Sequence, residues 1–214
     1  MTHASDRLGF ATRALHDSAD AEGPHRPRAT PIHLTAGFVD GQARFAGAEG
    51  AYSYTRVSNP TNAAAERRIA ALESGTGALL VGSGQAALAT TLLALLTSGD
   101  HILASSALYE GSREFIRSDL GRLGISATLV DEIDNVEAWE QAIRPETKLL
   151  FAESIANPRN QILDIAAIAD VAHRHRIPLV IDSTLATPAL LRPLEHGADI
   201  VVHSASKFLA GHGT

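Results

Sequence analysis

Short apolar runs alternate with amphipathic segments from residue 61 onward, and this alternation limits the folds that the chain can adopt. The runs are apolar at consecutive positions and are bounded by Gly, Pro, Asp or Ser. Continuous apolar strands are typical of a sheet that is covered on both faces, and helices between strands favour parallel pairing. We therefore predict an α/β fold with a mostly parallel sheet between helices. The predicted strands are Ala78–Val81, Ile102–Ala104, Thr128–Val130, Leu149–Ala152, Leu179–Ile181 and Ile200–Val202.

The segments between these runs carry helix signals. Asn135 and Asp164 stand where N-caps belong, and Gly75 stands where the first helix should end. Trp139 lies within one of these segments and is expected to pack in the core. The predicted helices are Asn62–Glu73, Gln85–Leu96, Gly111–Leu123, Val136–Ile143 and Ile165–His175.

The first 60 residues lack this periodicity. Pro24, Pro27, Pro31 and Pro60 punctuate them, which predicts an extended arm over residues 1–60 that packs on something else. Residues 61–214 are predicted to form one large domain. Because residues 211–214 give a loop signal rather than a closing helix, we expect this domain to be truncated.

Composition argues against several classes of function. The chain has no cysteine, so disulfides, thiolate nucleophiles and Cys-ligated metals are excluded. The net charge is −6, and no cluster of Lys and Arg predicts a nucleic-acid partner. His173 and His175 lie two residues apart on a predicted helix, where they point to different faces, so we expect no metal site. No apolar stretch is long enough to span a bilayer, and we expect a cytoplasmic protein without membrane contact.

A glycine-rich turn, Gly82-Ser83-Gly84-Gln85, joins a predicted strand to a helix. Free backbone N–H groups and the positive end of a helix suit a phosphate. A dinucleotide loop is the alternative, because Gly82-x-Gly84-x-x-Ala87 fits the permissive form of that pattern. It requires an acid at the end of the next strand, where this chain has residues 104–106, Ala-Ser-Ser. A tight turn without function is the third interpretation.

Two further features follow predicted strands. Asp182 ends one of them, so its carboxylate should emerge at the carboxyl edge of the sheet, where it can pair with a protonated ring nitrogen. Lys207 follows another, with Ser204 and Ser206 on a common side. Two hydroxyls suit a phosphate, and a desolvated lysine supplies the neutral amine that Schiff-base chemistry needs. Alone, these residues are most simply a turn aspartate and a surface lysine, but their convergence with the glycine-rich turn favours a pyridoxal-phosphate site.

With these residues, the chain resembles the fold-type I, pyridoxal-phosphate-dependent enzymes of cysteine and methionine metabolism. This family includes cystathionine synthases and lyases, methionine lyases and O-acetylhomoserine sulfhydrylases. The resemblance covers nearly the whole chain. The matching motifs are Pro31-Ile32-His33, Tyr54-Thr55-Arg56, Asn59-Pro60-Thr61, residues 83–87, Gly99-Asp100, Leu108-Tyr109, Glu153 with Asn157-Pro158, Asp182, residues 197–201 and residues 203–212.

The resemblance implies roles for individual residues. The backbone amides of Gly84 and Gln85 and the hydroxyls of Ser204 and Ser206 are expected to bind the cofactor phosphate. Lys207 is expected to hold pyridoxal 5'-phosphate as a Schiff base.

Other roles concern the cofactor ring and a second subunit. Tyr109 is expected to stack on the ring and transfer protons, Asp182 to hold the ring nitrogen, and Asn157 to lie near the phenolic oxygen. Tyr54 and Arg56 are expected to reach the phosphate in a neighbouring subunit. This arrangement implies a homo-oligomer, at least a dimer and commonly a tetramer.

Branch-specific residues point to the sulfhydrylases. Thr55, Gln85 and Ile155 match that branch, and methionine lyases tend to carry a cysteine near the position of Gly111. Glu110 and Ser183 depart from the usual residues of the family. The implied reaction is γ-replacement on O-acetylhomoserine by sulfide or a thiol, which gives homocysteine or methionine.

Other interpretations stay open. A cystathionine γ-synthase or a cystathionine or methionine γ-lyase is the main alternative, followed by a nicotinamide-dependent oxidoreductase and by an inactive fragment. Residues 1–214 alone are expected to be inactive, because family members carry the arginine that grips the substrate carboxylate in a later domain.

Overall fold

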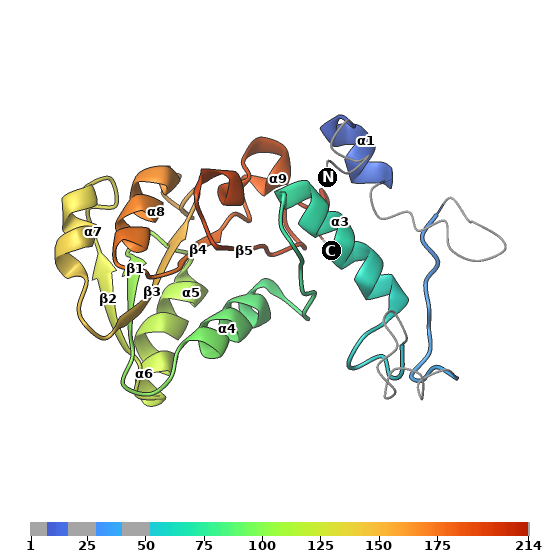
Figure 1. Ribbon diagram of the computed structural model, residues 1–214, viewed down its shortest axis with the longest axis horizontal. Helices are drawn as coiled ribbons and strands as arrows, with labels where there is room; N and C mark the ends of the chain where they lie inside the picture. The colour runs from blue at the N-terminus through green and yellow to red at the C-terminus, as the bar shows by residue number, and fades with distance from the viewer. Residues whose placement is uncertain (1–7, 17–28, 40–51, 214) are drawn as a thin grey trace. The chain divides into compact units, whose positions relative to one another are not determined.

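Five strands pair into one parallel sheet in the order β2-β1-β3-β4-β5 (Figure 1). This computed structural model describes residues 8–16, 29–39 and 52–213, and the chain divides into two compact units, residues 1–80 and 81–214. The sheet belongs to the second unit and confirms the predicted α/β fold. Its strands are β1 His101–Ser105, β2 Ser126–Val130, β3 Thr147–Glu153, β4 Leu179–Asp182 and β5 Ile200–Val202.

The helices of the second unit lie close to their predicted positions. Asn135 and Asp164 are N-caps, as predicted, and accept hydrogen bonds from the N–H groups of Ala138 and Ala167. The segment predicted as one helix over Gly111–Leu123 contains a π-helical turn. The elements are α4 Gly84–Leu95, α5 Glu110–Glu114, the π-helix η2 Phe115–Asp119, α6 Leu120–Arg122, α7 Val136–Ala142, α8 Ile165–Arg174, α9 Thr187–Leu190 and the 3-10 helix η3 Pro193–His196.

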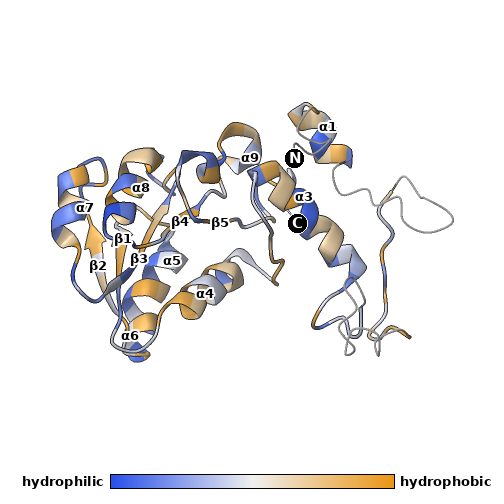
Figure 2. Ribbon diagram, viewed as in Figure 1, coloured by the Kyte–Doolittle hydropathy of each residue, from blue (hydrophilic) through white to orange (hydrophobic). Residues whose placement is uncertain are grey.

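Two clusters of buried apolar residues cover the two faces of the sheet, as the continuous apolar strands predict. Figure 2 shows the hydropathy of each residue along the ribbon. Alternate residues of each strand point to opposite faces. Leu103 and Leu150 pack with α7 and α8, whereas Ile102 and Phe151 pack with α4, η2 and α6. Trp139 is fully buried, and its indole N–H donates to the carbonyl of Ile133 at 3.1 Å, so its predicted packing role is confirmed.

The predicted strand at Ala78–Val81 is wrong. Within the described residues, no strand pairs with this segment, and Leu79 is 71% exposed. The N–H of Leu80 donates to the Glu66 carboxylate at 2.8 Å instead of to a neighbouring strand. An apolar run becomes a strand only where a ladder partner exists, which local sequence does not reveal.

Among its described residues, the first unit has two helices and segments without helix or strand. These helices are α1 Phe10–His16, which was not predicted, and α3 Pro60–Glu73, which is capped by Asn59. The helix α3 ends at Ser74 in the left-handed conformation (φ 60°), one residue before the predicted Gly75. Residues 29–39 and 52–58 meet at the bridge between Gly37 and Tyr54, and a turn follows at residues 55–57.

Part of the predicted arm lies outside the described residues. Pro24 and Pro27 lie outside the described residues. The division at residue 60 and the contribution of the arm to a neighbouring subunit stay predictions. Among the residues that the structure describes, no helix has the length and apolar character required to cross a membrane.

Candidate active site

A pocket of about 410 Å³ lies in the second unit, lined by residues at the carboxyl ends of β3 and β4, by the segment after β5 and by the start of α4. Parallel pairing brings these strand ends to one edge of the sheet, where α/β proteins bind ligands. The predicted site residues that line this pocket are Gly84, Gln85, Tyr109, Asn157, Asp182, Ser204, Ser206 and Lys207. Residues that are far apart in the sequence therefore come together as expected, although the individual roles stay predictions.

Gly84 is where the start of α4 approaches the segment that follows β5. A Cβ atom at this position would lie 2.6 Å from the Cβ of Ser204, a separation that side chains do not tolerate. Ser83 caps the helix through its hydroxyl, which accepts the N–H of Ala86 at 3.0 Å. The hydroxyl oxygens of Ser204 and Ser206 lie 3.4 Å apart on the other side of this contact. The first N–H groups of a helix beside two hydroxyls form a cradle that fits a phosphate.

Asp182 is held by Thr184, a pocket residue that the sequence analysis missed. The hydroxyl and the N–H of Thr184 donate to Oδ1 of Asp182 at 2.6 and 2.9 Å. The same hydroxyl accepts the N–H of Ser204 at 2.8 Å, so Thr184 links the acid to the hydroxyl cradle. A threonine two residues after a strand-ending aspartate is a known turn signal, but its second contact depends on the fold.

Burial raises the pKa of the Asp182 carboxyl, and the hydrogen bonds from Thr184 and the charge of His203 oppose this rise. A buried acid in this situation is stabilised in its ionised form by a cationic partner. The position of Asp182 therefore suits a protonated ring nitrogen.

Glu153 ends the central strand β3 and accepts two backbone hydrogen bonds. The N–H of Tyr109 donates to Oε1 at 2.6 Å, and the N–H of Asn157 donates to Oε2 at 2.9 Å. Burial raises the pKa of the Glu153 carboxyl to about 7, against the lowering effect of these two N–H groups, and the charge of Asp182 raises it further. The sequence analysis quoted Glu153 as part of a motif and gave it no role.

Tyr109 precedes α5, and its side chain is 48% exposed. A Cβ atom at Gly111 would lie 2.6 Å from Cε1 of the Tyr109 ring and 3.2 Å from Nε2 of Gln85. The amide of Gln85 also donates to the hydroxyl of Ser112 at 3.4 Å. Glycine at position 111 therefore leaves room for the ring and the amide to lie side by side.

Lys207 lines the pocket within a run of turns after β5. Its side chain is exposed, as is that of Phe208, so the expected desolvation of the amine is not observed. Residues 208–212 form turns and bends, and they leave the Lys207 side chain exposed. The only other lysine in the sequence is Lys148, an exposed residue of β3 that does not line the pocket.

Tyr54 and Arg56 belong to the first unit. The guanidinium carbon of Arg56 lies 5.0 Å from the centre of the Tyr54 ring, and Nη2 donates to the phenol oxygen at 3.4 Å. The two residues form a pair, and their predicted contact with the cofactor of a neighbouring subunit stays a prediction.

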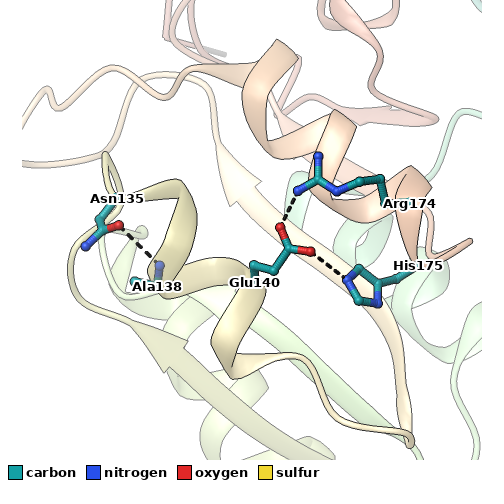
Figure 3. Close-up of polar contacts among 5 residues, drawn as sticks. All are labelled: Asn135, Ala138, Glu140, Arg174 and His175. Carbon is teal, nitrogen blue, oxygen red and sulfur yellow. Dashed lines mark hydrogen bonds and ion pairs between the residues drawn. The ribbon is translucent and has the colours of Figure 1, made fainter.

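His173 and His175 contact different carboxylates. Nε2 of His173 lies 3.0 Å from Asp199, and Nε2 of His175 lies 3.0 Å from Glu140. Glu140 also accepts from Arg174, and these contacts join α7 to α8 (Figure 3). The hydrogen bond from Arg174, followed by that from His175, lowers the pKa of the Glu140 carboxyl. His173 lies in the last turn of α8, and His175 is the C-cap of this helix.

Comparisons with known proteins identify the family of the chain. Residues 11–214 match the family described as Cys/Met metabolism PLP-dependent enzyme. The chain is 44% identical to the O-acetyl-L-homoserine sulfhydrylase of Corynebacterium glutamicum, over 98% of this chain and 49% of the relative. It is 45% identical to the L-methionine gamma-lyase of Porphyromonas gingivalis, over 97% of this chain and 53% of the relative.

A solved structure is similar as well. A Campylobacter jejuni chain, described as an O-acetylhomoserine (thiol)-lyase with N'-pyridoxyl-lysine-5'-monophosphate, matches with a TM-score of 0.91 at 37% identity. The match covers 97% of this chain and 52% of that chain. The chain thus spans about half the length of the relatives it matches.

The close approach at Gly84 gives a testable prediction. Gly84→Ala forces a Cβ against Ser204, and overpacking of this kind costs about 1–3 kcal/mol. We expect the complete protein to bind pyridoxal phosphate at least about 10-fold more weakly, measured by absorbance titration after the cofactor is removed. Gly82→Ala is the matched control, because a Cβ at Gly82 meets no atom within 4 Å. Equal affinities of the two variants for pyridoxal phosphate would contradict the role of Gly84 in the phosphate cradle.

The raised pKa of Glu153 predicts a pH-dependent difference in stability. An acid whose pKa rises from 4.5 to about 7 on folding favours the folded state most below pH 4.5, and this contribution is lost as pH rises through 7. Glu153→Gln has no titrating group at this position, so it does not lose this contribution as pH rises. The unfolding free energy of the cofactor-free variant minus that of the cofactor-free wild type should therefore increase by up to about 3 kcal/mol between pH 5 and 8. Urea unfolding measures this trend, and parallel pH profiles would show that Glu153 titrates normally.

Proposed function

The chain belongs to the family of Cys/Met metabolism PLP-dependent enzymes, and from this membership we propose that the complete protein is a transferase of the O-acetylhomoserine sulfhydrylase type. O-Acetylhomoserine loses acetate from Cγ in this reaction and gains sulfide or a thiol at the same carbon. The product is homocysteine or methionine. The proposal is supported by the sulfhydrylases of Corynebacterium glutamicum and Leptospira meyeri, which are 44% and 43% identical to the chain.

One observation carries the proposal. The pocket unites a phosphate cradle, a carboxylate at the end of a strand, an aromatic ring and a lysine, contributed by segments from Gly84 to Lys207. When bound, pyridoxal phosphate joins the substrate through its aldehyde and accepts electrons from the substrate carbons. A site for this cofactor needs all four kinds of group, and the pocket supplies them together.

Family membership and the lining of the pocket support a role for each reacting side chain. Lys207 carries the amine that holds the cofactor and then moves protons at Cα and Cβ of the substrate. Asp182 keeps the ring nitrogen protonated through its carboxylate, which Thr184 orients. Tyr109 would stack on the ring of the bound cofactor and exchange a proton through its phenol. The Asn157 amide would lie near the phenolic oxygen of that ring.

The phosphate contacts imply an assembly. Gly84 and Gln85 donate backbone N–H groups, and Ser204 and Ser206 donate hydroxyls. Tyr54 and Arg56 complete the same phosphate site in a neighbouring subunit, so the active form is a homo-oligomer of at least two chains. We place this oligomer in the cytoplasm, with an amino acid and sulfide or a thiol as its small-molecule partners.

Methionine γ-lysis is the second candidate, because several relatives of 38–45% identity are L-methionine gamma-lyases. The sulfhydrylase proposal is favoured by Gly111, which stands where methionine lyases tend to carry a cysteine. A side chain at this position would press on the Tyr109 ring, so a lyase-type residue requires a different arrangement of the ring and Gln85.

An activity assay separates the two candidates. We expect the complete protein to convert O-acetylhomoserine and sulfide to homocysteine, and to release much less methanethiol from methionine. Lys207→Ala should abolish turnover, because it removes the amine that holds the cofactor, whereas Lys148→Ala should retain it. Predominant release of methanethiol would favour the lyase, and full activity of Lys207→Ala would refute the site.

A further inference from the structure

Glu153 occupies the centre of the pocket edge without belonging to the cofactor contacts described above. It is the last residue of β3, which lies between β1 and β4 in the sheet. Its side chain is 7% exposed, and it stands in register with Asp182 on the neighbouring strand. Burying a second carboxylate next to Asp182 is unfavourable, so its presence calls for a compensating function.

The hydrogen bonds of Glu153 join two separate segments. Tyr109 follows β1, and Asn157 follows β3, and each donates its backbone N–H to a different oxygen of the same carboxylate. An ionised carboxylate offers two acceptor oxygens and no donor. An amide has an NH2 group in place of one acceptor oxygen, and the O–H oxygen of a protonated acid is a weaker acceptor, so the ionised side chain satisfies the two N–H groups best. The shorter side chain of aspartate extends one methylene less toward the two segments.

The Asn157 segment is already ordered within itself. Ile155 and Ile162 form a bridge, and the N–H of Ala156 donates to the carbonyl of Gln161 at 2.9 Å. The N–H of Ser154 donates to the carbonyl of Asp182 at 2.9 Å, which ties the segment to β4. Through Glu153, this unit is also tied to the Tyr109 segment.

The Tyr109 segment has fewer constraints of its own. Tyr109 occupies the N-cap position of α5, and its side chain makes no capping bond. Its backbone N–H donates to Glu153. The Tyr109 ring and the Asn157 side chain both line the pocket. A change in the separation of the two backbones moves both side chains relative to any group bound between them.

We propose that Glu153 is a positioning residue that sets the separation of Tyr109 and Asn157 on either side of the cofactor ring. This inference rests on the proposed function, because it concerns the same site. It adds a pocket residue to which no contact with the phosphate or the ring nitrogen is assigned, and which acts through the backbones of Tyr109 and Asn157. The rise of its pKa under burial is the unfavourable term that the two N–H groups partly offset.

Hydrogen exchange of the cofactor-free protein above pH 7, where the Glu153 carboxyl is ionised, tests whether Glu153 clamps the backbones of Tyr109 and Asn157 together. In Glu153→Ala, amide exchange should become at least about 10-fold faster in peptides covering residues 106–110 and 155–159, because a hydrogen bond to a charged group is lost in each. Glu153→Gln should release one of the two segments, since its amide accepts only one N–H. Glu140→Gln, which breaks the exposed contacts between α7 and α8, is the control and should leave both segments protected.

Cofactor release tests the positioning role. We expect pyridoxal phosphate to leave Glu153→Ala and Glu153→Gln at least about 10-fold faster than wild type, with a changed visible circular dichroism of the bound cofactor. Glu153→Asp keeps the charge and loses the reach, so it should behave like Glu153→Gln. Full rescue by aspartate would assign the effect to charge and overturn the clamp.

Two further results are decisive. Faster exchange with unchanged cofactor release and dichroism would overturn the positioning role and leave the proposed function intact. Failure of the wild-type protein to bind pyridoxal phosphate would refute the proposed function and the positioning role together, even if the exchange experiment showed the clamp.

Discussion

Parallel pairing of β1, β3, β4 and β5 is the constraint on which the candidate site depends. It directs the carboxyl end of every strand to one edge of the sheet. Glu153, Asp182 and the segment from His203 to Lys207 all follow from this arrangement, because each stands at or just after a strand end. The apolar clusters on both faces fix the strands, since a shift of one residue would exchange the sides on which alternate residues lie.

The site is assembled by contacts between segments rather than within them. Gly84 lets α4 approach Ser204, Thr184 joins Asp182 to Ser204, and Glu153 joins Tyr109 to Asn157. Ser204, Tyr109 and Asn157 each donate a backbone N–H to these contacts, and the side chains of Thr184 and Glu153 accept them. The positions of these three backbones therefore depend on two buried or partly buried side chains. Geometry of this kind favours catalysis, because small displacements of reacting groups are costly.

Much of this arrangement could be predicted from the sequence. Runs such as Ile200–Val202 and caps such as Asn135 carry their own local signals, and the motifs around Asp182 and Lys207 are specific to one family. The segment at Ala78–Val81 was wrongly predicted because a strand also needs a partner. The short helices α9 and η3 contain too few residues to show a helical period. The contact of Thr184 with Ser204 and that of Glu153 with Tyr109 join residues 20 and 44 positions apart, so local patterns could not reveal them.

Reduction followed by peptide mapping tests the central assignment most directly. Borohydride converts the linkage between pyridoxal phosphate and a lysine into a stable amine, and the sequence offers only Lys148 and Lys207 as positions within this chain. Mass spectrometry of the digested, reduced protein should find the pyridoxyl group on the peptide that contains Lys207 and leave the Lys148 peptide unmodified. A modified Lys148 peptide, or an unmodified Lys207 peptide in protein that retains the cofactor, would contradict the assignment.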